Sequence, residues 1–169
     1  MMKGIAIEYR PMVATDYEQV AQIYQQGIAT GNATFQQNIP TWEDWDESHL
    51  KNCRTVGIMD NKVVGWAALT AVSSRCVYAG VAEVSVYVAT NYRGLKIGTK
   101  LLEYQIEESE ASNIWTLQAG IFPENIASIK IHKQLGFRIV GKREKIGKMN
   151  GKWRDTLLLE RRSEKIGVE

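Results

Sequence analysis

The stretch SVYVATNYRGLKIGTKLL, residues 85–102, constrains the fold of this chain more than any other segment. Its first residues alternate as a β-strand does, and its last residues place apolar side chains at the spacing of an α-helix. The turn between the two contains Arg93, Gly94, Lys96 and Gly98. A strand that runs through a glycine-bearing turn into a helix is a place to hold an anion.

The physical reason lies in the start of the helix. The first backbone N–H groups of a helix have no partner within it, and the helix dipole places about half a positive charge there. Glycines allow a phosphate to approach the backbone closely, and Arg93 and Lys96 add charge at the rim. Taken by itself, this stretch is equally compatible with an ordinary turn that carries solvated basic residues.

The N-terminal part of the chain predicts one strand and two helices. Residues 5–10 alternate as a strand. Thr15 and Glu18 have the spacing of a capping box and open a helix that fades near residues 31–32. Thr41 opens a second, shorter helix with the same type of signal. The long loop between the two helices is suited to a ligand site.

The remaining two thirds of the chain predict six strands and two helices. A hairpin flanks Asn61, and a valine-rich strand covers residues 80–90. A helix from Gly94, a strand over residues 114–121, a helix stopped by Gly136 and a hairpin around Asn150–Gly151 follow. The order βα(α)βββαβαββ predicts an α/β (mixed α+β) fold, with a twisted mixed sheet of about seven strands flanked by about four helices.

Length and composition exclude several classes of protein. A chain of 169 residues with 44% hydrophobic residues suits one domain, residues 1–169. Its net charge of +2 gives no global attraction to nucleic acid. Cys53 and Cys76 lack the spacing of a metal or redox site, and no apolar run of 18 residues is present. We therefore expect a cytoplasmic protein with no metal, no nucleic-acid partner and no membrane association.

The motifs in their order resemble the GNAT N-acetyltransferase superfamily. In that superfamily the pattern Arg/Gln-x-x-Gly-x-Gly/Ala binds the pyrophosphate of acetyl-CoA. Arg93 and Gly98 match its first and last positions, while Lys96 replaces the middle glycine. We expect Lys96 to lie in the first helical turn, where a side chain costs little and the N–H stays available. No G-x-G-x-x-G is present, which excludes a dinucleotide site of the Rossmann type.

Roughly residues 5–163 resemble the phosphinothricin acetyltransferase group, which includes methionine sulfoximine and methionine sulfone acetyltransferases. The similar segments include IYQQGIATGNATF, AEVSVYV, IWTLQAGIFPEN, SIKIHKQLGF and KWRDTLLLERR. The resemblance implies a GNAT-like fold and a homodimer that uses acetyl-CoA. It also implies transfer of the acetyl group to the α-amine of a small amino-acid analogue.

Two residues are candidates for the chemistry. Glu83 is the only residue in the segment GVAEVSVYVA that is charged at neutral pH, and it lies on the face opposite the valines. A glutamate there is otherwise a solvated or salt-bridged residue; the resemblance implies a general base, acting directly or through a water. His132 follows Asn125 by seven residues and therefore lies on the same side of its helix, two turns away. A lone histidine is commonly a packing residue, whereas the resemblance implies a role as acid, base or orienting group.

The resemblance also implies the contacts of the acyl carrier. Asn125 suits a helix N-cap and would also hold the pantetheine arm, whose amides would pair with the backbone of the valine-rich strand. The implied acetyl-CoA contacts are Val86, Tyr87, Val88, Arg93, Gly94, Leu95, Lys96, Ile97, Gly98, Thr99, Asn125 and Ser128.

The implied contacts of the acceptor come from two loops and the same strand. Arg75 would bind the substrate α-carboxylate through its guanidinium fork, although a solvated loop arginine is the alternative. Phe35 would cover the substrate from the long first loop. The implied acceptor contacts are Phe35, Ser74, Arg75, Tyr78 and Ser85.

Two other functions stay open from the sequence. An acetyltransferase acting on a protein or peptide N-terminus would need an open groove, and the long loop of residues 31–40 favours a small closed pocket instead. A non-catalytic module that binds acyl-CoA is the alternative suggested by Lys96 in place of glycine.

Overall fold

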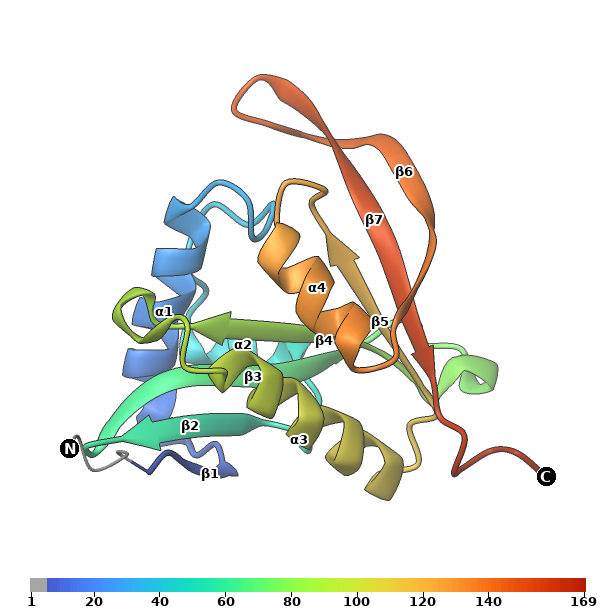
Figure 1. Cartoon of the computed structure of the whole chain (residues 1–169), viewed down its shortest axis with the longest axis horizontal. Coiled ribbons are helices and arrows are strands. Elements are labelled where there is room, and N and C mark those ends of the chain that lie inside the picture. The colour runs from blue at the N-terminus through green and yellow to red at the C-terminus, as the bar shows by residue number, and fades with distance from the viewer. Residues whose placement is uncertain (1–5) are drawn as a thin grey trace.

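The computed structural model describes residues 6–169, and within them seven strands form one sheet in the order β1-β2-β3-β4-β5-β7-β6 (Figure 1). Only the β4–β5 pair is parallel. The strands are β1 (Glu8–Pro11), β2 (Thr55–Met59), β3 (Lys62–Ala71), β4 (Val81–Val88), β5 (Thr116–Ile121), β6 (Arg138–Met149) and β7 (Lys152–Arg162). The mixed sheet predicted from the order of the elements is confirmed.

The structure has four α-helices within the described residues, and they cover the two faces of the sheet (Figure 1). They are α1 (Tyr17–Ala29), α2 (Trp42–Ser48), α3 (Ile97–Ala111) and α4 (Ile126–Gln134). Three short 3-10 helices connect other elements: Ala14–Asp16, Cys76–Tyr78 and Thr90–Tyr92.

The two faces of β4 have different neighbours, as its alternating sequence predicts. Val84 is buried in one core cluster with Leu102 of α3, and Ile129 of α4 packs against this cluster. On the other face, Tyr87 packs against a second cluster that contains Val20 of α1 and Trp45 of α2. The valine face of the strand therefore lies under α3 and α4, and the face that carries Glu83 lies on the side of α1 and α2.

The parallel ladder between β4 and β5 is short. Its Cα register runs from Val81–Thr116 to Glu83–Gln118 and ends there. Beyond this point β4 continues along β3 as far as Val88, and β5 continues along β7 as far as Ile121. Figure 1 shows β4 and β5 diverging. The backbone edges of both strands are therefore free to meet a ligand where they part.

Two turns follow directly from local sequence. Asn150 and Gly151 both have positive φ, 50° and 79°, as a two-residue hairpin between β6 and β7 requires. Gly136, at φ 92°, follows the C-terminus of α4. The N–H of Gly136 donates to Lys133 O and that of Phe137 to His132 O, which is the paired bonding of a Schellman motif.

The expected start of the first helix is wrong. Thr15 and Glu18 form no capping box, because residues 14–16 form a 3-10 turn and α1 begins at Tyr17. Asp16 accepts a hydrogen bond from the Val13 N–H at 2.9 Å and pairs with Arg10 at 2.8 Å. This ion pair, with Asp16 buried and Arg10 partly exposed, fixes the entry to α1 in place of a capping box. The predicted first strand is also shifted, since β1 covers Glu8–Pro11 and residue 5 lies outside the described residues.

The expected position of Lys96 is wrong as well. The helix begins at Ile97 rather than at Gly94, and Lys96 is its N-cap residue with φ 61° and ψ 19°. This is the left-handed region, which costs an L-residue roughly 1–2 kcal/mol and which glycine adopts freely. Gly94 also has positive φ, 83°. The family pattern has glycine at this position because the backbone there is left-handed. The sequence of this chain, with lysine, does not reveal that conformation.

Candidate active site

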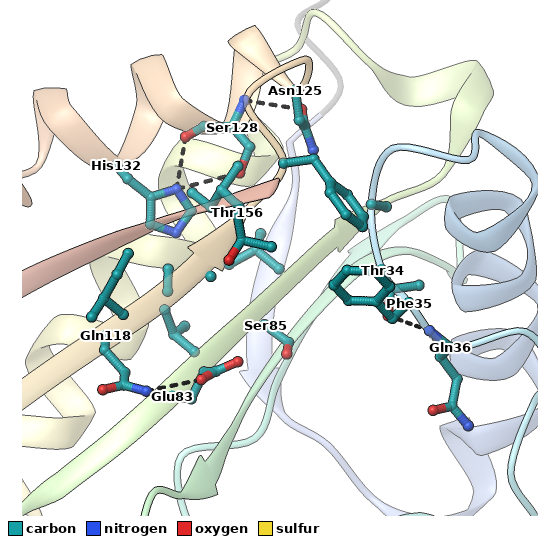
Figure 2. A pocket seen from close by; sticks show the side chains of 18 of the residues that line it. Thr34, Phe35, Gln36, Glu83, Ser85, Gln118, Asn125, Ser128, His132 and Thr156 are labelled. Atoms are coloured by element: carbon teal, nitrogen blue, oxygen red, sulfur yellow. Dashed lines mark hydrogen bonds between the residues drawn. The ribbon is translucent and has the colours of Figure 1, made fainter. Parts of the chain in front are cut away.

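A cavity of about 430 Å³ lies where β4 and β5 part. Figure 2 shows its side chains converging from several elements: the loop after α1, both diverging strands, α4 and the β6–β7 hairpin. Its lining residues are Ala33, Thr34, Phe35, Gln36, Glu83, Val84, Ser85, Val86, Tyr87, Gln118, Ala119, Gly120, Ile121, Phe122, Asn125, Ser128, His132, Arg143, Ile146, Thr156 and Leu158. Because the strands separate here, side chains from both faces of the sheet reach one space.

Glu83 stands at the point of divergence. It is half-buried and is paired in register with Gln118 of β5. The Gln118 Nε2 donates a hydrogen bond to Glu83 Oε2 at 3.0 Å (Figure 2). No cation contacts this carboxylate within the described residues. Gln118 holds one carboxylate oxygen, and the other is available to accept a proton.

His132 reaches the same cavity from α4, and its surroundings define its tautomer. The ring is 5% exposed, and its Nδ1 lies 2.7 Å from the backbone oxygen of Ser128. A carbonyl oxygen only accepts hydrogen bonds, so Nδ1 carries the proton. Nε2 then has a free lone pair, and no described residue is bonded to it. The neutral ring offers an acceptor atom at Nε2.

Burial also favours the neutral ring. Desolvation lowers the pKa of His132 below its usual 6.5, and the hydrogen bond to Ser128 opposes this effect only in part. The ring packs edge-on against Phe137 at 4.9 Å between centroids, which keeps water away from it. At neutral pH His132 is therefore uncharged and able to accept a proton.

The predicted residues Asn125 and Ser128 lie at the start of α4 and line the cavity. Asn125 is the N-cap, as predicted, and its Oδ1 accepts from the Ser128 N–H at 3.3 Å. Its Nδ2 donates to the backbone oxygen of Asn32 at 3.2 Å. Asn125 thus connects the helix to the loop that carries Phe35.

The residues predicted to bind an anion lie at the start of α3, outside the cavity lining. The N–H groups of Ile97, Gly98 and Thr99 begin the helix and have no acceptor among residues 6–169 outside the helix itself. A Cβ on Gly98 would meet Ile131 and Val88 at an ordinary 3.5 Å and Val86 at 4.0 Å, so this glycine lies against α4 and β4. Arg93, Gly94, Leu95 and Lys96 are exposed around this terminus.

Tyr87 lines the cavity but is unsuited to proton transfer. Burial raises the pKa of its phenol far above 10. Its ring stacks on Trp66 at 4.9 Å and meets Tyr24 at 5.0 Å. The side chain is part of the core, while the backbone of residues 86–88 lies along β4 beyond the end of its ladder with β5.

Three predicted acceptor residues lie elsewhere. Ser74, Arg75 and Tyr78 belong to the exposed connection between β3 and β4 and do not line the cavity. The Arg75 guanidinium lies 5.9 Å from the Tyr78 ring centroid instead. Of the predicted acceptor contacts, Phe35 and Ser85 line the cavity.

Sequence reasoning missed several lining residues, and Arg143 of β6 is the most informative. Among the residues around the cavity it is the only arginine or lysine, and its side chain forms no hydrogen bond or ion pair with a described residue. Gln118 and Thr156 add neutral polar groups. Nothing in the local sequence marks these positions, because the strands that carry them meet only through sheet pairing.

Residues 6–169 lack two features that would suggest other functions. No helix has both the length and the apolar character needed to span a bilayer. No three His, Cys, Asp or Glu side chains gather in a way that suits a metal ion.

Comparison with known proteins gives consistent similarities. Residues 8–158 match the family model described as an acetyltransferase (GNAT) domain. The chain is 36% identical over 83 residues to the L-methionine sulfoximine/L-methionine sulfone acetyltransferase of Pseudomonas paraeruginosa, a match that spans 49% of this chain and only 48% of that protein.

Two solved structures share the fold over almost the whole chain. One is a GNAT superfamily phosphinothricin acetyltransferase from Sinorhizobium meliloti in complex with AcCoA, with TM-score 0.83, 25% identity and coverage of 92% of this chain and 88% of that one. The other is a ribosomal-protein-alanine N-acetyltransferase from Brucella melitensis, with TM-score 0.86, 28% identity and coverage of 92% and 99%.

Proposed function

Because this chain belongs to the GNAT acetyltransferase family, we propose that it transfers the acetyl group of acetyl-CoA to the α-amine of a small amino-acid analogue. Analogues of the phosphinothricin, methionine sulfoximine or methionine sulfone type are the acceptors that similar proteins are named for. One observation carries the proposal: Glu83 and His132, from opposite faces of the sheet, line one cavity at the opening between β4 and β5.

Acetyl-CoA fits the features that lead to this cavity. The free N–H groups at the start of α3 suit its pyrophosphate. The edge of β4 beyond Glu83 offers backbone groups to the pantetheine amides, because the ladder with β5 ends at that residue. Asn125 and Ser128 line the cavity at its α4 side. A thioester held along this path would have its reacting end beside Glu83.

The reaction needs two protons to leave the acceptor nitrogen. The α-ammonium loses one to become a nucleophile, and the nitrogen loses the second as its bond to the carbonyl carbon forms and the carbon–sulfur bond breaks. One proton ends on the thiol of the product and the other in solvent. In our proposal Glu83 takes a proton from the nitrogen as the general base.

The tautomer of His132 suits it to the second proton transfer, the one that ends on the departing thiolate. With Nδ1–H donated to Ser128 O, the free Nε2 accepts a proton rather than donates one in the resting enzyme. Once protonated at Nε2, the imidazolium becomes a donor to the departing thiolate. The lowered pKa makes that proton easy to release, which suits a relay group.

The charge of Arg143 suits the carboxylate of the acceptor. The arginine lines the cavity and has no ion-pair partner among the described residues, so its guanidinium can bind a carboxylate bidentately. Within one chain we assign this contact to Arg143 in preference to Arg75, which lies outside the cavity lining. Phe35 and Ser85 line the part of the cavity that would hold the acceptor amino acid, which we call the acceptor end.

A homodimer is part of this proposal. The β6–β7 hairpin exposes apolar side chains at Ile139, Val140 and Trp153, with exposed fractions of 42%, 44% and 59%. Such a surface suits a second copy.

A cytoplasmic location is also part of the proposal. Both cysteines are free thiols, as a reducing compartment such as the cytoplasm would leave them.

An N-terminal acetyltransferase is the second candidate, favoured by the similarity to the ribosomal-protein-alanine enzyme. The test is acetyl-CoA-dependent thiol release with phosphinothricin, methionine sulfoximine, methionine sulfone and an alanine-initiated peptide. Turnover on the amino-acid analogues supports the proposal, and turnover on the peptide alone replaces it. Tight acetyl-CoA binding in calorimetry, with no transfer to any amine, would instead indicate a binding module.

A further inference from the structure

Arg154 of β7 joins three segments that are distant in the sequence. Its Nη1 donates to the backbone oxygen of Gly31 at 2.8 Å, and its Nη2 donates to Asn32 Oδ1 at 2.9 Å. Nη2 also lies 3.2 Å from Glu124 Oε2, and the guanidinium lies 4.1 Å from the Phe122 ring centroid. Its side chain is 16% exposed. One side chain therefore holds the loop after α1 against the turn between β5 and α4.

The neighbouring strand β6 leaves space for the same loop. Gly147 of β6 is the register partner of Arg154, so their side-chain positions point to the same face of the hairpin. A Cβ on Gly147 would lie 2.9 Å from two ring carbons of Phe35. Phe35 also packs against Phe122 at 4.8 Å between centroids. The hairpin thus holds the loop at Gly31 and Asn32 and accommodates its aromatic tip at Gly147.

The same loop is tied to the start of α4. Asn125 donates to the backbone oxygen of Asn32 at 3.2 Å. Some bonds of the loop are short-range, such as Gln36 N–H to Thr34 Oγ1 at 3.0 Å, whereas the Thr34 side chain also interacts with the partly buried phenols of Tyr24 and Tyr87. Because local bonds do not anchor a loop to the rest of the fold, the position of Phe35 depends on the long-range contacts, and Arg154 makes two of these hydrogen bonds on the side of the hairpin.

We propose that Arg154 is a positioning residue that fixes residues 30–36 as the wall of the acceptor end, and thereby limits the size of the amine that the cavity admits. This inference rests on the proposed acetyltransferase function. The guanidinium is suited to the task, because its planar fork bonds two acceptors of one loop while its face stacks on Phe122. A lysine would keep the charge but would lose both the planar fork that bonds two acceptors and the flat face that stacks on Phe122.

The test compares Arg154→Lys with Arg138→Lys. Arg138 lies on the same hairpin, 67% exposed, and pairs with Glu160 away from the cavity. For Arg154→Lys we expect the KM of the small amino-acid acceptor to rise about tenfold, while the KM of acetyl-CoA changes less than about twofold. We also expect kcat/KM for a dipeptide to rise relative to that for the single amino acid. Arg138→Lys should match the wild type in all three values.

A second readout does not depend on activity. Chymotrypsin cleaves after phenylalanine, and Phe35 is held between Phe122 and the hairpin. Cleavage between Phe35 and Gln36, followed by mass spectrometry on the folded protein, should be at least several-fold faster in Arg154→Lys than in the wild type or Arg138→Lys. The melting temperatures of the variants establish that the fold is kept.

The outcomes separate the inference from the function beneath it. Unchanged cleavage at Phe35 in a folded Arg154→Lys protein, or an equal rise in both KM values, overturns the positioning role. If no amine is acetylated by the wild type, the proposed function fails, and faster cleavage at Phe35 would still establish that Arg154 holds the loop.

Discussion

Glu83 and Gln118 are the last registered pair of the parallel ladder between β4 and β5, and their side chains are joined by a 3.0 Å hydrogen bond from Gln118 Nε2 to Glu83 Oε2. The pair lies where the sheet opens, so the carboxylate is held by one strand and exposed to the cavity formed by both. The separation of β4 and β5 thus both opens the cavity and places the Glu83 carboxylate at its edge.

The first prediction concerns Glu83. Glu83→Gln keeps the size of the side chain and its contact with Gln118 but cannot accept a proton. We expect kcat to fall at least about tenfold near neutral pH, since a placed general base contributes roughly 10²–10⁴-fold. Glu107→Gln, an exposed change on α3, is the control and should leave the rate unaltered. An unchanged pH–rate profile in Glu83→Gln would count against the role of Glu83 as base.

The second prediction concerns the tautomer of His132. Two-dimensional ¹H–¹⁵N NMR of the imidazole groups should show a proton on Nδ1, and titration should give a pKa below 6.5. His49→Gln identifies which of the two histidine signals belongs to His132. A proton on Nε2 at neutral pH would refute the acceptor role.

The third prediction is a pH dependence of stability. Burial lowers the pKa of both His49 and His132. An unfolded histidine binds its proton near pH 6.5 and the folded one only at lower pH, so below about 6.5 the unfolded state binds more protons. The free energy of unfolding should therefore fall as the pH is lowered from about 6.5 to 5. Urea unfolding of the double variant His49→Gln/His132→Gln should show a flatter dependence over this range.

The fourth prediction compares two glycines of β6. Gly147→Ala places a methyl group 2.9 Å from the Phe35 ring, whereas Gly141→Ala has no heavy atom within 4 Å. We expect Gly147→Ala to displace Phe35 and raise the acceptor KM several-fold, with little change in the KM of acetyl-CoA. Gly141→Ala should behave as the wild type in steady-state kinetics. Equal kinetics for the two variants would mean that Phe35 does not bound the acceptor end.

The fifth prediction concerns Lys96. Lys96→Gly relieves a left-handed backbone at φ 61°, a gain of roughly 1–2 kcal/mol that the flexibility of glycine in the unfolded chain reduces by about 0.5–1 kcal/mol. We expect a net stabilisation of about 0.5–1 kcal/mol in urea unfolding. Lys130→Gly, within α4, should instead destabilise by about 1 kcal/mol. A loss of stability in Lys96→Gly would show that the lysine side chain makes a compensating contact.

The sequence by itself determined the order of the elements and several of their ends. The alternation of β4, the hairpin at Asn150–Gly151 and the helix stop at Gly136 are local patterns, and a local pattern is decided by backbone sterics and by which face must be buried. The same locality explains two of the errors. The ion pair between Arg10 and Asp16 replaced an expected cap, and Lys96 adopted a conformation that its residue type does not signal.

Only the tertiary structure decided how the site is assembled. Sheet pairing placed Gln118 beside Glu83, across 35 positions of sequence, and packing of the first loop on β7 placed Gly31 against Arg154, across 123. It also left Arg75 outside the cavity and brought Arg143 to it. The physical reason is that such contacts depend on where strands pair and where they part, which is set by packing across the whole sheet and leaves no periodic trace in the neighbouring residues.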